Sequence, residues 1–90
     1  MSLQYKKIEK IVKGFANHRR IQVLELLKKT PDLSVDDISQ NLNVGFFTIS
    51  DHIRKLADTG LVNKQYKGRF VIHSLTIIGK SVLSFCKMLE

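Results

Sequence analysis

VGFFTISDHIRKLADTGLV, residues 44–62, contains one complete helix together with the signals that begin and end it. Three apolar residues recur at the spacing of a single helix face: Ile49, Ile53 and Leu56. Gly45 lies in a tight turn just before this pattern. The pair Thr59-Gly60 ends the pattern, because glycine takes the left-handed conformation without a Cβ penalty. The segment therefore predicts a helix over residues 46–58.

The two phenylalanines at the start of this helix have different predicted positions. At about 100° per residue, Phe46 lies near Ile49 and is predicted to pack in the core, whereas Phe47 lies on the opposite side. The outer part of the helix also carries polar and charged residues: Thr48, Ser50, Asp51, Arg54 and Lys55. Phe47 at such a surface suits either an apolar contact with a base or a contact with a partner protein. Asp51 is predicted to pair within the helix, with the cations three and four residues on, rather than to contact cytosine.

A shorter helix is predicted immediately before the turn. Ser34 and Asp37 form a capping-box pattern, and apolar residues follow at helical spacing: Val35, Ile38 and Leu42. Two short helices joined by a tight turn are typical of a helix-turn-helix, whose second helix fits the major groove of DNA. The side chains predicted to reach the groove are Phe47, Thr48, Ser50, Asp51, Arg54 and Lys55, and four of them are predicted to sample bases: Phe47, Thr48, Ser50 and Arg54. The alternative is a helical hairpin that serves only the core.

Residues 61–75, LVNKQYKGRFVIHSL, predict a two-stranded hairpin, because β-branched and aromatic residues flank Lys67-Gly68. Basic side chains gather within residues 64–70 around its tip: Lys64, Lys67 and Arg69. Such a wing suits the sugar-phosphate backbone or the minor groove of duplex DNA. A charged hairpin that only protects an edge strand is the alternative.

The other helices flank this unit. Residues 3–14 and 77–89 each carry a wide apolar stripe, which makes both helices candidates for dimerisation. Asn17 is predicted to cap a helix that stops before Pro31, and Thr76 is predicted to cap the last helix. The predicted fold is mainly α (α+β): a winged helix-turn-helix in the order helix, helix, helix, helix, strand, strand, helix, with a two-stranded wing.

The composition predicts one domain over residues 1–90, since so short a chain supports a single core. Fifteen Lys and Arg against eight Asp and Glu give a net charge of +7, concentrated toward both ends, which favours a polyanionic partner. No apolar run suits a membrane span or a signal peptide, so no membrane partner and a cytoplasmic location are expected. A lysine-rich first helix on an anionic membrane is the alternative, but its apolar face is needed for the core or a dimer.

Three segments together resemble the ArsR-like winged helix-turn-helix regulators over nearly the whole chain. They are residues 15–27 (FANHRRIQVLELL), residues 33–62 and residues 67–75 (KGRFVIHSL). In the first segment, Arg20 lies at the family's arginine position. MarR-like regulators share one further pattern of this chain, in which Leu75-Thr76 is followed by Gly79.

The resemblance implies a sequence-specific regulator of double-stranded DNA, more often a repressor, in which Arg20 joins the wing residues in neutralising phosphates. It also implies a homodimer that pairs through the terminal helices, with these residues in the contact: Tyr5, Ile8, Val12, Val82, Phe85 and Leu89. The family has polar residues where Gly45, Phe46 and Phe47 lie, so the resemblance does not extend to the operator sequence or to readout of bases by polar side chains. The rival from another class is a winged-helix module that docks an acidic partner protein.

Metal, cofactor and catalytic sites are not predicted. Three histidines lie far apart in the sequence: His18, His52 and His73. Of these, His52 is predicted to pack between helices rather than to bind a metal. Cys86, the one cysteine, excludes an intramolecular disulfide and is predicted to be an inert core residue, with redox sensing as the alternative. No nucleophile has a nearby base, and nothing in the sequence indicates an effector.

Overall fold

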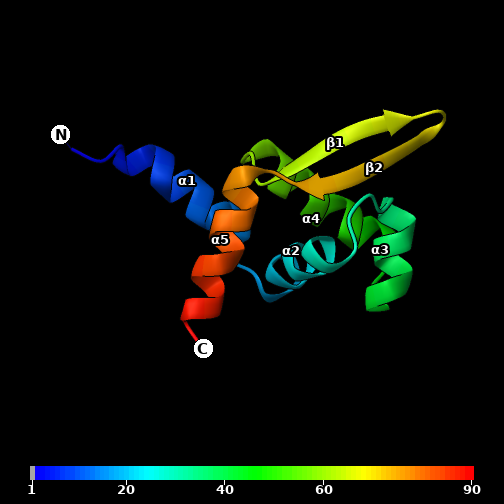
Figure 1. Ribbon diagram of the computed structural model, residues 1–90, viewed down its shortest axis with the longest axis horizontal. Helices are drawn as coiled ribbons and strands as arrows, with labels where there is room; N and C mark the ends of the chain where they lie inside the picture. Colours follow the sequence, from blue (N-terminus) through cyan, green and yellow to red (C-terminus); the bar gives the residue numbers. More distant parts are fainter. Residues whose placement is uncertain (1) are drawn as a thin grey trace.

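The computed structural model describes residues 2–90, and this part of the chain forms five helices and two strands (Figure 1). In chain order they are α1 (Tyr5–Phe15), α2 (His18–Lys29), α3 (Val35–Leu42), α4 (Phe46–Asp58), β1 (Val62–Lys67), β2 (Phe70–Leu75) and α5 (Ile77–Met88). This is the predicted order. The first helix begins two residues later than predicted, and the helix predicted over residues 46–58 has those bounds.

Side-chain caps fix the starts of three helices. The Asn17 side chain accepts hydrogen bonds from the first turn of α2, and Ser34 and Asp37 form a reciprocal capping box at α3. The Thr76 hydroxyl accepts a hydrogen bond from the Gly79 backbone N–H at the start of α5. Each cap satisfies an N–H group that a helix leaves without a partner, so the predicted starts are confirmed.

The core lies between α2, α3, α4 and the beginning of β1. Its fully buried side chains are Val23, Leu24, Leu27, Ile38, Ile49, Ile53, Leu56 and Leu61. The helix α2 packs against α5, α4 and β2, and Figure 1 shows it in the middle of the molecule. By contrast, the first six residues of α1 are exposed, and α1 extends away from the body.

The wing is an antiparallel hairpin whose register runs from Val62 opposite Leu75 to Lys67 opposite Phe70. Its base is attached to the body through Leu33, which forms an isolated bridge with His73. The backbone N–H and the imidazole Nδ1 of His73 both donate to the Leu33 carbonyl, at 2.9 Å and 2.8 Å. The rest of the hairpin projects beyond the helices (Figure 1).

Two glycines allow the terminal helices to lie directly on residues 59–61, which join α4 to β1. A Cβ atom at Gly79 of α5 would lie 2.1 Å from the Leu61 carbonyl oxygen. A Cβ atom at Gly14 of α1 would lie 2.5 Å from the Thr59 hydroxyl oxygen. Both helices therefore meet the segment between α4 and the wing.

We expect the fold to lose stability in mild acid because of His73, which is only 2% exposed. Burial disfavours the imidazolium form and lowers the pKa of His73 below its ordinary value of about 6.5. The unfolded chain therefore binds more protons as the pH falls below that value, so stability is complete above about pH 6.5 and decreases below it. Urea denaturation at about pH 7.5 and about pH 5.5 measures this loss.

The matched variant is His73→Gln, whose amide donates to the same carbonyl but does not titrate. We expect a smaller difference between the two urea midpoints in this variant. An unchanged difference would contradict the assignment to His73.

Candidate nucleic-acid interface

The turn between α3 and α4 is held by local contacts. Asn43 takes the left-handed conformation, with φ of 54°, and the Ser39 hydroxyl donates a hydrogen bond to the Val44 carbonyl. Ile49 and Ile53 of α4 are buried in the core, as is Ile38 of α3. The exposed face of α4 is thus fixed relative to the rest of the domain.

The structure brings the predicted base-contacting residues together on the outer part of α4. Phe47 is 85% exposed, and Thr48 and Arg54 are exposed as well. Ser50 and Lys55 are half-buried at the margins of this surface. The α4 surface therefore combines one aromatic ring with hydroxyl groups and cations, which offers both apolar and hydrogen-bonding contacts.

The prediction that Phe46 packs in the core is wrong. Its side chain is 46% exposed, and its ring lies edge-on to that of Phe47, with 5.6 Å between the ring centroids. Helical periodicity places Phe46 on the Ile49 side, but Phe46 is the first residue of α4, and the neighbouring elements cover only part of it. It lines an open groove of about 470 Å³ between α3 and β2.

Asp51 forms the predicted pairs inside α4. Its carboxylate accepts a hydrogen bond from Arg54 and lies 3.1 Å from the Lys55 Nζ atom. The hydrogen bonds from Lys55 and then Arg54 lower the pKa of Asp51. Asp51 is therefore ionised at neutral pH, and it orients two cations along the exposed surface.

The wing places its three predicted cations in solvent. Lys64 and Lys67 lie on β1, and Arg69 follows Gly68 in the turn, where Gly68 has a φ of 65°. The structure adds Tyr66 and Phe70, which are 79% and 63% exposed beside the tip. The sequence predicted strands here, but a strand pattern alone does not predict which aromatic side chains are exposed to solvent.

Arg20 lies at a different place from these residues, at the junction of α1, α2 and α4. Its Nε atom donates to Nδ1 of His52 at 3.1 Å, and its Nη1 atom donates to the carbonyls of Lys13 and Gly14 at 3.3 Å and 3.2 Å. Desolvation and then the neighbouring Arg20 charge lower the pKa of His52. His52 therefore contacts another helix, as predicted. The phosphate contact of Arg20 stays a prediction.

The apolar stripes of α1 and α5 form a second exposed surface. A groove of about 360 Å³ between these helices is lined by Ile8, Ile11, Val12, Phe15, Ile78, Ser81, Val82 and Phe85. Four of the predicted dimer residues belong to this groove, while Tyr5 and Leu89 are exposed near the ends of the same helices. The structure thus brings four of the six predicted dimer residues together in one groove and leaves two outside it.

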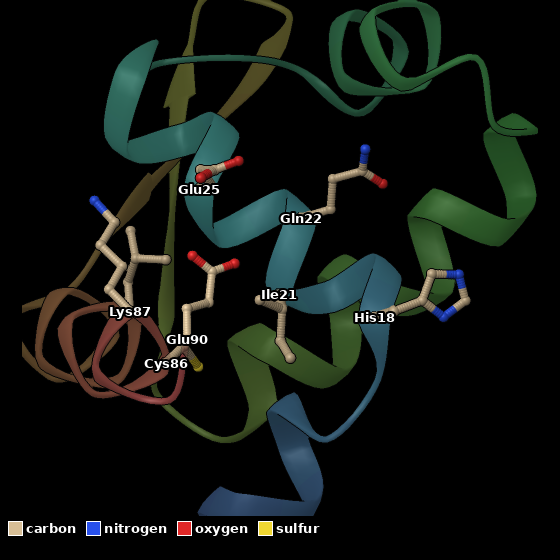
Figure 2. Close-up of a pocket in the computed structure, with 8 residues that line it drawn as sticks. His18, Ile21, Gln22, Glu25, Cys86, Lys87 and Glu90 are labelled. Carbon is tan, nitrogen blue, oxygen red and sulfur yellow. The ribbon is translucent and has the colours of Figure 1, made fainter.

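A hollow of about 230 Å³ between α2 and α5 contains the half-buried Cys86 (Figure 2). Glu25 and Glu90 lie on opposite sides of it, and the His18 ring points away from Cys86. Burial raises the pKa of the Cys86 thiol, so the reactive thiolate is disfavoured at neutral pH. An inert Cys86 fits this setting.

Within residues 2–90, we find no group of three or more His, Cys, Asp or Glu side chains arranged to hold a metal ion. In the same range, every helix is too short or too polar to cross a membrane.

The helix-turn-helix, the basic hairpin and the exposed α4 surface define the winged helix-turn-helix class of DNA-binding domain. Residues 17–64 match the family described as bacterial regulatory protein, arsR family. The chain therefore belongs to the arsR family of bacterial regulatory proteins, which is a family of transcriptional regulators and not of enzymes. This match decides in favour of the ArsR-like over the MarR-like resemblance.

Individual relatives agree with this assignment. The transcriptional activator HlyU of Vibrio cholerae serotype O1 is 33% identical over 66 residues, which is 73% of this chain and 60% of the relative's length. A structure of HlyU from Vibrio cholerae N16961 matches with a TM-score of 0.83 and 29% identity, covering 99% of this chain and 97% of that chain. The homodimeric winged helix-turn-helix domain of a possible ArsR-family regulator from Mycobacterium bovis has the same fold, with a TM-score of 0.85, 21% identity and coverages of 99% and 89%.

Proposed function

We propose that this protein is a sequence-specific regulator that binds double-stranded DNA with α4 in the major groove and the wing on the backbone or in the minor groove. One observation carries the proposal: α4, which exposes Arg54, packs against β1 of the hairpin, which exposes its cations around the tip. Membership of the arsR family supports the same function. A cytoplasmic location belongs to this proposal.

The proposed contacts divide into two kinds. Lys64, Lys67 and Arg69 neutralise phosphates, which gives affinity but carries no sequence information. Base edges are sampled from α4 by these residues: Phe47, Thr48, Ser50 and Arg54. Phe47 meets the methyl group of a thymine, and Asp51 orients Arg54 and Lys55 rather than facing a phosphate. The apolar contact of Phe47 with a thymine thus replaces hydrogen bonds that a polar side chain at this position would make to a base.

The proposed binding unit is a homodimer that pairs through α1 and α5. The exposed apolar groove supports this arrangement, and so does the Mycobacterium bovis domain, which is described as homodimeric. Two recognition helices related by a twofold axis meet successive major-groove faces about 34 Å apart, so we expect a roughly palindromic operator. Repression is the regulatory outcome we propose, although the Vibrio cholerae relative is described as an activator.

The experiment that tests DNA binding is fluorescence anisotropy with a random-sequence duplex at several salt concentrations. We expect micromolar or tighter binding at low salt and a steep decrease as the salt concentration rises. Replacing Lys67 and Arg69 together by alanine is expected to weaken binding about equally for all duplexes. It should also reduce the salt slope by about one unit for each phosphate that is no longer neutralised.

Phe47→Ala is the matched variant for this experiment, because it removes an exposed side chain without changing the charge. We expect its salt slope to stay the same, while its preference among duplexes shifts, most of all between thymine and uracil at a contacted position. No binding of the wild-type protein at low salt would overturn the proposal.

A protein-docking function is the second candidate, and the exposed aromatic rings of Phe46, Phe47 and Phe70 favour it. These rings and the basic wing would meet an acidic partner. Absence of DNA binding, combined with an unchanged fold, is the result that favours this candidate.

A further inference from the structure

Arg20 connects three helices through one guanidinium group. The carbonyls of Lys13 and Gly14, which Arg20 contacts, belong to the last turn of α1, where a helix has no N–H partners of its own. A positive charge at a helix C-terminus also meets the negative end of the helix dipole. From α2, Arg20 thus caps α1 while its Nε atom contacts His52 in the middle of α4.

The neighbouring contacts make this connection specific. Gly14 is buried and lies against Thr59, at the C-terminal end of α4, so the end of α1 touches α4 directly. His52 is half-buried and lies one position after Asp51, which orients the cations of the α4 surface. Arg20 therefore acts at the point where the dimer-facing helix meets the recognition helix.

We infer that Arg20 is a positioning residue, which couples α1 to the proposed recognition helix α4 through its hydrogen bond to His52. This hydrogen bond forms only while His52 is neutral. The inference rests on the proposed DNA-binding function. It gives Arg20 a role inside the fold in place of the predicted contact with a phosphate.

The neutral state follows from the geometry of the hydrogen bond. Because Nε of Arg20 is a donor, Nδ1 of His52 must accept with its lone pair, and the proton of the neutral ring is on Nε2. Protonation at Nδ1 places two N–H groups opposite each other and a second positive charge beside Arg20. The other charged or titratable groups that face His52 are Asp51 and Lys55 on α4 and His18 on α2, and only Asp51 favours the imidazolium.

DNA affinity is then expected to fall as the pH is lowered from about 7.5 to about 5.5, since His52 becomes charged as the pH approaches its lowered pKa. An added positive charge alone would strengthen DNA binding, so the expected decrease is opposite in sign to a simple charge effect.

The first test is Arg20→Lys, which keeps the charge but replaces the planar fork by a single ammonium group. The positioning role predicts about tenfold weaker binding to the duplex, with the same salt slope as the wild type. A phosphate contact predicts nearly wild-type binding for Arg20→Lys, and for Arg20→Gln it predicts a salt slope lower by about one unit per protomer. That second pattern would overturn the inference.

The second test is His52→Gln, in which the amide oxygen accepts from Arg20 but does not titrate. We expect this variant to bind as tightly as the wild type at about pH 7.5 and to show a flat profile down to about pH 5.5. His18→Gln removes the exposed histidine that faces His52 and is expected to keep the decrease in affinity toward low pH. If His52→Gln follows the wild-type profile, the coupling through His52 is refuted. Circular dichroism at each pH shows whether the wild type and the variants remain folded.

A third measurement does not depend on DNA. Nitrogen-15 NMR of the histidine rings in the free protein is expected to show His52 with an accepting Nδ1 and a protonated Nε2, and Arg20→Lys is expected to change these signals. If the wild type binds no duplex while the NMR result holds, the proposed function fails and the connection stands. If His52 shows a protonated Nδ1, the connection itself is overturned.

Discussion

Replacing Gly79 with alanine is expected to lower the free energy of unfolding by about 3 kcal/mol, which is at the upper end for overpacked cores. The added Cβ atom would lie 2.1 Å from the Leu61 carbonyl oxygen, well inside van der Waals contact. The Leu61 oxygen belongs to the backbone and the position of a Cβ atom is fixed by its own backbone, so no change of side-chain rotamer relieves the clash. The helix α5 must move away from Leu61 as a whole, and Leu83 of α5 then becomes less buried in the core.

Urea denaturation of the variant measures this effect, and Gly45→Ala is the matched control. Gly45 has a φ of −54°, and the nearest atom to a Cβ at that position is 3.9 Å away. We expect Gly45→Ala to change the free energy of unfolding by less than about 0.5 kcal/mol. Equal effects of the two substitutions would contradict the role assigned to the contact between Gly79 and Leu61.

A negative charge at Phe85 is expected to convert the proposed dimer into monomers and to weaken DNA binding about 100-fold. Phe85 is 50% exposed and lines the apolar groove between α1 and α5, so Phe85→Glu places a carboxylate in the proposed interface. A monomer loses the gain in affinity that comes from holding two recognition helices together. Sedimentation equilibrium and anisotropy with a palindromic duplex measure the two effects.

Ser84→Glu is the control for this experiment, since it adds the same charge at an exposed neighbouring position of α5 outside the groove. We expect Ser84→Glu to leave the dimer intact and to weaken DNA binding only slightly. A Phe85→Glu protein that remains dimeric and binds with full affinity would show that the chains pair elsewhere or not at all.

Local signals account for the parts of the fold that the sequence predicted. Asn17, Ser34 and Thr76 cap helices through hydrogen bonds to residues two or three positions away, so a short stretch of sequence contains both partners. The helix over residues 46–58 and the pairs of Asp51 follow from the same short-range periodicity. These features were predictable because their physics is local.

Contacts between distant residues were not predictable in this way. Arg20 and His52 are 32 positions apart, and nothing in either segment indicates that they meet. The close approach of Gly79 to Leu61 depends on where α5 crosses the chain, which periodicity does not specify. Phe46 illustrates the remaining limit, since periodicity gives the direction of a side chain but not whether another element covers it.

The attachment of the wing at its base, where residues 32 and 33 bind the backbone of His73, has a consequence for the motion of the hairpin. The bridge to His73 fastens the base of β2 to the core, whereas residues 63–70 are all exposed. Amide groups near the base are therefore protected by the stability of the whole domain, while those near the tip exchange through small local openings. The cations of the wing thus belong to its least protected part, and in the proposed DNA complex small local openings there would let Lys67 and Arg69 follow phosphates whose spacing varies along the duplex.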